Sequence, residues 1–184
     1  MRIHFGGIVK SIAFLLILSN VLLATNRVLM PKSIIANNRW PTTSTYHQFY
    51  NMKHDSVDVL FLGSSVTVNA FSPQEIYNHF GIRSYNLGSE QQSIFLSYFW
   101  LKEALRFQTQ QVVILDTKFL FELHKENPIN TTEGLIRKCL DPMRWSCVKQ
   151  EAVKELCAID KDQTELSYYF TNIRYHSRWS DLKE

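Results

Sequence analysis

The sequence predicts an α/β protein: an incomplete three-layer, flavodoxin-like parallel sheet of about three strands, preceded by one transmembrane helix. Two observations support this. Short apolar runs alternate with helix-type segments over residues 57–116, and the N-terminus holds a long stretch without charge. We therefore expect a signal anchor or transmembrane helix at residues 1–30, a linker at 31–53, and a partial α/β domain with a helical C-terminal part at 54–184.

The N-terminal segment is the predicted membrane helix. Ser11–Asn26 has no charged residue, and with its apolar neighbours it gives a span of roughly 20–25 residues, enough for a bilayer core of about 30 Å. The alternative is a cleaved signal peptide, but a cut after Ala24 would leave Leu22 where a small residue is required. We therefore expect an uncleaved anchor that places residues 31 onward outside the cytoplasm.

The formal charge of +3 belongs to this segment alone. The first thirty residues carry three basic residues and no acidic one, so the rest of the chain is neutral. A neutral globular part lacks the basic surface that nucleic-acid binding requires. The expected partner is the membrane, through residues 1–30, and not nucleic acid.

The first predicted strand leads into a tight turn. A short helix over Tyr46–Met52 is expected to precede it. In Ser56–Thr67, SVDVLFLGSSVT, the run after Asp58 is apolar on both faces, which is typical of a strand buried in a parallel sheet. Gly63 ends the run.

Two helices and two further strands follow. Ser72 as N-cap, Pro73 and Glu75 predict the start of a helix that Gly81 ends. Arg83–Leu87 is the second strand. Ser89 with Gln92 predicts the start of the next helix, which extends to about Phe107, and Gln111–Asp116 is the third strand. Three more helical segments are expected at residues 132–140, 148–156 and 163–175.

The β-α-β-α-β pattern predicts parallel strands, whose carboxyl ends meet at one edge of the sheet. Ligands bind at that edge in such folds. The three ends are Gly63-Ser64-Ser65, Leu87-Gly88-Ser89 and Asp116-Thr117-Lys118.

Ser65 is the candidate nucleophile at this edge. A serine in a sharp turn after a buried strand suits acyl-transfer chemistry, and the N–H groups of Ser65 and Gly88 are candidate oxyanion donors. The turn lacks the second glycine of a G-x-S-x-G motif and the lysine of a phosphate loop. A plain strand-to-loop turn is the alternative reading, and the spacing does not decide between them.

The cysteines indicate neither a metal nor a cofactor. Cys139, Cys147 and Cys157 form no C-x-x-C pair. Either two of them form a bridge, most simply Cys139 with Cys147, or all three are partly buried thiols.

The stretches VLFLGSSVTVNAFSP, SYNLGSEQQS and QQVVILD resemble the opening of the SGNH/GDSL hydrolase superfamily. They are most similar to its membrane-anchored extracytoplasmic branch, which includes DltD-like D-alanyl-transfer proteins and polysaccharide acyltransferase-like domains. In that branch GSS commonly replaces GDS. The late YHSRWSDL stretch is also similar to a segment of bacterial members. The resemblance implies that Ser65 is the nucleophile and one oxyanion donor, and that Gly88 is the second donor.

Two blocks of that superfamily are not matched. Asp116-Thr117-Lys118 stands where a G-x-N-D block is expected, and no histidine follows an aspartate by three residues. His124 and His176 are the histidines that follow the core strands. We therefore expect the N-terminal portion of a longer protein, or a truncated gene product, that is inactive or nearly so by itself.

These features predict a membrane-anchored, extracytoplasmic SGNH-type serine esterase or acyltransferase-like protein that acts on cell-envelope glycans. The alternative is a non-catalytic envelope protein that binds a cell-surface glycan or a membrane-bound acyltransferase. A third possibility is a non-functional fragment whose exposed sheet edge causes aggregation.

Overall fold

The computed structural model describes residues 5–31, 41–118, 129 and 131–180. The chain divides into two compact units. One is Met1–Pro31 together with Leu166–Glu184, and the other is Lys32–Glu165. The residues from Leu166 onward are thus grouped with the N-terminal helix, whereas the sequence assigned them to the globular part.

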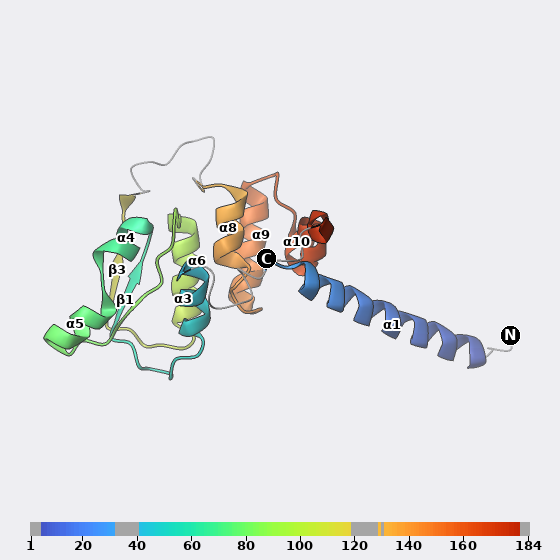
Figure 1. Ribbon diagram of the computed structural model, residues 1–184, viewed down its shortest axis with the longest axis horizontal. Helices are drawn as coiled ribbons and strands as arrows, with labels where there is room; N and C mark the ends of the chain where they lie inside the picture. Colours follow the sequence, from blue (N-terminus) through green and yellow to red (C-terminus); the bar gives the residue numbers. More distant parts are fainter. Residues whose placement is uncertain (1–4, 32–40, 119–128, 130, 181–184) are drawn as a thin grey trace. The chain divides into compact units, whose positions relative to one another are not determined.

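The sheet lies in the Lys32–Glu165 unit (Figure 1). Its strands are β1 (Val59–Leu62), β2 (Ser84–Asn86) and β3 (Val112–Leu115). They are parallel in the order β2-β1-β3, with Val59 of β1 opposite the first residue of each neighbour. The prediction of a parallel α/β sheet of three strands with an N-terminal apolar helix is confirmed. The flavodoxin-like three-layer arrangement stays a prediction.

Two helices connect β1 to β2. α4 (Ser65–Ala70) begins directly after the Gly63-Ser64 turn and was not predicted. α5 (Pro73–Phe80) begins and ends as predicted: the Ser72 side chain accepts the Glu75 N–H, and Gly81 closes the helix with a φ of 68°. Only glycine adopts this left-handed conformation without strain.

The start of α6 (Ile94–Ala104) corrects the sequence analysis. Its N-cap is Ser93, whose side chain accepts the Leu96 N–H, and not Ser89. The side chains of Ser89 and Gln92 are buried and have other partners: Ser89 Oγ contacts Cys139 Sγ at 3.1 Å, and Gln92 accepts the Tyr46 hydroxyl at 2.7 Å. These tertiary contacts remove both residues from the capping role.

Three further helices pack near α6. They are α3 (Pro41–Phe49), α8 (Glu133–Leu140) and α9 (Cys147–Ile159), and α8 and α9 contact α6 (Figure 1). Tyr46 of α3 stacks on Trp100 of α6 with ring centroids 4.2 Å apart. Both rings are fully buried, so this aromatic pair forms the centre of the core.

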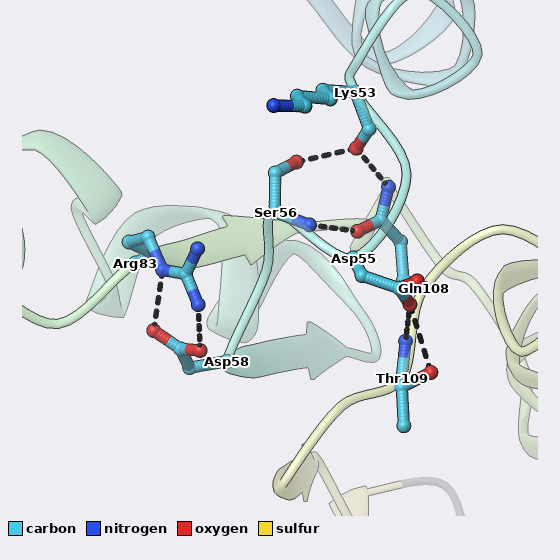
Figure 2. Close-up of polar contacts among 7 residues, drawn as sticks. All are labelled: Lys53, Asp55, Ser56, Asp58, Arg83, Gln108 and Thr109. Atoms are coloured by element: carbon cyan, nitrogen blue, oxygen red, sulfur yellow. Dashed lines mark hydrogen bonds and ion pairs between the residues drawn. The ribbon is translucent and has the colours of Figure 1, made fainter.

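The amino-terminal end of the sheet is closed by polar contacts (Figure 2). Gln108, which is buried, accepts the Ser56 N–H at 2.8 Å and donates to the Lys53 carbonyl at 2.9 Å. Asp55 accepts both the N–H and the hydroxyl of Thr109. These hydrogen bonds join the segment before β1 to the segment before β3. The polar residues at this end of the sheet therefore have a structural role.

In the other unit, α1 (Phe5–Leu29) is the long apolar helix. Its Gly6–Leu29 stretch has a mean hydropathy of 2.1 and is exposed over most of its length, although Leu29 at its end is buried. The stretch is long and apolar enough to cross a membrane. α10 (Glu165–Tyr169), α11 (Thr171–Tyr175) and the 3-10 helix η1 (His176–Ser180) end the described chain. The single helix predicted at 163–175 is therefore wrong, because Phe170 takes a non-helical conformation between α10 and α11.

Candidate functional site

The carboxyl ends of the three strands meet at one edge, as the sequence predicted. The Ser89 N–H donates to the Gly63 carbonyl at 3.0 Å, which joins the end of β2 to the end of β1. The Asp116 N–H donates to the Leu62 carbonyl at 2.9 Å, which joins the end of β3 to β1. The predicted site residues Ser65 and Gly88 both belong to this edge.

Gly63 is required by the geometry of the turn. Its φ is 141°, a conformation that residues with a side chain rarely adopt. A Cβ atom added here would lie 2.3 Å from the Asp116 Cβ and 2.6 Å from the Thr67 Oγ1. The chain therefore passes between β3 and α4 at a point where only a hydrogen atom fits.

Ser64 is a structural residue. Its side chain is buried, and its hydroxyl donates to Asp116 Oδ2 while it accepts the Val66 N–H as the N-cap of α4. Its own N–H also donates to Asp116 Oδ2, at 3.2 Å. A hydroxyl so enclosed cannot reach a substrate.

The Asp116 carboxylate is fully engaged in these contacts. Besides Ser64, it accepts the Lys118 N–H at 2.8 Å. Burial by itself raises the pKa of Asp116, but the hydrogen bonds from Ser64 and Lys118 outweigh it and hold the pKa below its usual value. Asp116 is therefore ionised at neutral pH and acts as the acceptor that fixes the Gly63-Ser64 turn.

Ser65 differs from Ser64 in exposure and in bonding. It is the first residue of α4 and is partly exposed. Within the described ranges, its hydroxyl has no hydrogen-bond partner. Among the described residues of this edge, Ser65 is thus an accessible serine with an unengaged hydroxyl, and it is the serine predicted as the nucleophile.

Gly88 lies beside this turn, with its N–H engaged. That N–H donates to Asn86 Oδ1 at 3.0 Å, and Asn86 Nδ2 donates to the carbonyls of Thr67 and Phe71. Its assignment as an oxyanion donor stays a prediction, and it requires the bond to Asn86 to break.

The absence of a side chain at Gly88 has a structural cause. A Cβ atom there would lie 3.0 Å from Asn86 Oδ1, 3.1 Å from the Gly63 carbonyl oxygen and 3.2 Å from the Thr67 Cβ. Close packing of the two turns explains the glycine without a substrate.

Of the two histidines considered as bases, His176 lies among the described residues. His124 lies outside the described residues. His176 begins η1 in the other unit, where its Nδ1 lies 2.8 Å from the Ile173 carbonyl oxygen. In the described part of the chain, no hydrogen bond joins Ser65 to a histidine or a carboxylate, so no proton acceptor is in place there.

The cysteines are free thiols, so the bridge between Cys139 and Cys147 is not formed. Cys139 is buried against Ser89 and Tyr46, and burial raises the pKa of its thiol. Over the described residues, no group of three His, Cys, Asp or Glu side chains could hold a metal ion.

Two features of this edge were not predicted from the sequence: the role of Asn86 and the contact between Ser64 and Asp116. Asn86 was overlooked although an Asn two residues before a glycine is a common turn former, a signal that was present in SYNLGS. The Ser64–Asp116 contact had no local signal, because the two residues are 52 positions apart.

Comparison with protein-family models, with curated proteins and with solved structures finds no match to this chain.

Proposed function

We propose that this protein is a membrane-anchored, extracytoplasmic SGNH-type serine esterase or acyltransferase-like protein, with Ser65 as its nucleophile and acyl esters of cell-envelope glycans as its substrates. In this proposal the α/β unit has the flavodoxin-like layering of that superfamily. The apolar helix α1 anchors it in the membrane, because its length and composition suit a bilayer core.

One observation carries the proposal. At the carboxyl edge of the sheet, the Ser64 hydroxyl is hydrogen-bonded to Asp116. The neighbouring Ser65 is partly exposed, and its hydroxyl has no hydrogen-bond partner in the described part of the structure. A serine at this place in a parallel α/β fold is positioned to meet a ligand. Catalysis further needs a base, which the described residues do not supply, so we expect slow turnover or none from this chain alone.

A fluorophosphonate probe, which forms a covalent bond with nucleophilic serines, tests the assignment on the full chain in detergent micelles. We expect slow labelling of the wild-type chain and none of Ser65→Ala. The matched control is Ser72→Ala, which removes an exposed serine before the next helix and leaves labelling unchanged. Labelling that persists in Ser65→Ala would exclude Ser65 as the nucleophile.

The alternative is a non-catalytic envelope protein that binds a glycan or a membrane-bound acyltransferase with the same edge. It is favoured by the Gly88 N–H, which donates to Asn86 and is not available to an oxyanion in this structure. Hydrolysis of an acyl ester by the wild-type chain, lost in Ser65→Ala, would exclude this alternative. Glycan binding that is equal in both chains, without hydrolysis, would support it.

A further inference from the structure

The end of α1 is joined to a segment from the far end of the sequence. The Asn172 N–H donates to Asn26 Oδ1 at 2.9 Å, and Arg178 Nη1 donates to the Leu29 carbonyl at 2.9 Å. The Leu29 carbonyl is one of the last four of α1, which lack a partner within the helix, so Arg178 caps the helix. α11 and η1 both contact α1 and belong to the same compact unit.

The position of this contact along α1 sets its depth in a bilayer. The Gly6–Leu29 stretch has 24 residues, and at 1.5 Å per residue it is about 36 Å long, slightly more than a hydrocarbon core of about 30 Å. Asn26 and Leu29 then lie at one boundary of that core. The residues bonded to them must lie at the same boundary.

The segment Phe170–Ser180, here named the interfacial segment, has the side chains that suit this place. Its exposed apolar residues are Phe170, Ile173 and Trp179, with exposed fractions of 44%, 49% and 65%. Trp and Tyr are enriched at the boundary between lipid and water, where an apolar ring meets polar headgroups. The exposed rings of Phe170 and Trp179 therefore suit that boundary.

The charges agree with the same location. The interfacial segment carries Arg174 and Arg178 and no acidic residue, and Arg27 of α1 is close in sequence to the bonded Asn26. Basic residues near a bilayer surface are attracted to anionic lipid headgroups, and long basic side chains reach the headgroups from the apolar boundary.

We propose that the interfacial segment is a second membrane contact, which lies in the lipid headgroup boundary beside the end of α1 and inserts Trp179 and Ile173 among the lipids. This inference rests on the membrane anchor of the proposed function and does not depend on the chemistry of Ser65. It gives the C-terminal helices a role that the α/β unit does not explain.

Tryptophan quenching by brominated lipids tests the proposal on the full chain. The protein is inserted into phosphatidylcholine vesicles, with and without phosphatidylglycerol, whose acyl chains carry bromine near the headgroup. The Trp179 signal is the difference between the wild-type chain and Trp179→Phe. Since interfacial side chains lie about 5–10 Å into the headgroup boundary, we expect this signal to lose about half of its intensity.

The matched control is Trp145, an exposed tryptophan of the Lys32–Glu165 unit, isolated in the same way with Trp145→Phe. We expect its signal to be quenched by aqueous iodide and not by brominated lipid. A second variant, Arg178→Leu, removes the cap on α1 and should lower the quenching of Trp179.

The outcomes are separate. If α1 is inserted, shown by resistance to alkaline carbonate extraction, and Trp179 is quenched by iodide but not by brominated lipid, the interfacial contact is refuted. Equal lipid quenching of Trp145 and Trp179 also refutes it, because the segment is then not distinctive. If carbonate extracts the chain, the anchor itself fails. Failure of Ser65 to react with a phosphonate leaves this inference untouched.

Discussion

The Ser64 hydroxyl and the Asp116 carboxylate are bonded to each other, and this contact holds the end of β1 against the end of β3. The two residues occupy the carboxyl edge of the sheet, which is the edge where ligands bind in parallel α/β folds. Their contact leaves Ser65 as the accessible serine of the turn and orients it as the first residue of α4. The proposed nucleophile therefore depends on a buried neighbour for its position.

Replacing Asp116 should destabilise this turn. Asp116→Asn keeps the shape of the side chain but removes the negative charge of the carboxylate, which accepts three hydrogen bonds. Hydrogen bonds to charged groups contribute about 1.5–3 kcal/mol each, so we expect a loss of about 2 kcal/mol in the free energy of unfolding. Urea unfolding in detergent micelles measures it. Asp162→Asn, an exposed aspartate of a distant loop, is the control and should change little.

The same contact predicts a pH dependence. The folded-state pKa of Asp116 is below its unfolded value, so its contribution is complete above the unfolded pKa, near 4, and is lost as the pH falls through the folded pKa. The difference in stability between wild type and Asp116→Asn should shrink below about pH 4. A difference that stays constant down to pH 2 would contradict the assignment of the charge.

Gly63→Ala should be far more harmful than Gly81→Ala. Both glycines have a positive φ, but a Cβ at Gly81 meets nothing within 4 Å, whereas at Gly63 it meets Asp116 and Thr67. Strain alone costs about 1–2 kcal/mol at Gly81, and the overlap at Gly63 raises the expected loss to about 3 kcal/mol or more. Thermal unfolding of the two variants compares them directly, and equal losses would show that the turn relaxes.

The buried Lys149 predicts stability that rises with pH. Its ammonium group donates to the carbonyls of Asp141 and Met143, and burial lowers its pKa to about 8. Between pH 8 and 10 the unfolded chain still holds this proton, whereas the folded chain has largely released it. The free energy of unfolding therefore rises with pH over this range. At about 1.4 kcal/mol per pH unit, wild type should gain about 2–3 kcal/mol relative to Lys149→Met over this range.

Lys102 supplies the control for this measurement. Its hydrogen bond with Glu151 raises its pKa, so the stability that it contributes is lost only at higher pH. The difference between wild type and Lys102→Met should therefore stay level from pH 8 to 10. The comparison of the two differences removes every pH effect that is common to both variants.

The parts of the fold that the sequence predicted well are those set by local chemistry. Apolar runs located all three strands, and Ser72 and Gly81 located the ends of α5, because capping involves residues within one turn. The start of α6 was misplaced because Ser89 is bonded to Cys139, fifty positions away. No local pattern reports such a contact.

The site shows the same limit. Its edge and its serine were predictable from strand ends and the turn, but α4 was not. Val66, Thr67 and Val68 are β-branched residues with low helix propensity, and the helix they form is begun by Ser64, which Asp116 holds in place. The engagement of the Gly88 N–H by Asn86 likewise depends on the packing of α4.

The exposed edge strand gives the last prediction. All four residues of β3, Val112–Leu115, are exposed by 37–48%, and the outer edge of β3 has no strand partner among the described residues. Unprotected apolar edges pair with other chains, as expected for the aggregating fragment considered above. A lysine on such an edge is a natural defence against pairing.

Val113→Lys and Ile114→Lys, which act on opposite faces of the strand, should each weaken self-association in micelles by about tenfold, or 1.4 kcal/mol. Ile159→Lys changes a residue of similar exposure, 44%, on α9 and should have no such effect. Sedimentation velocity measures the association, and a wild-type chain that stays monomeric at all concentrations would show that this edge is protected by other means.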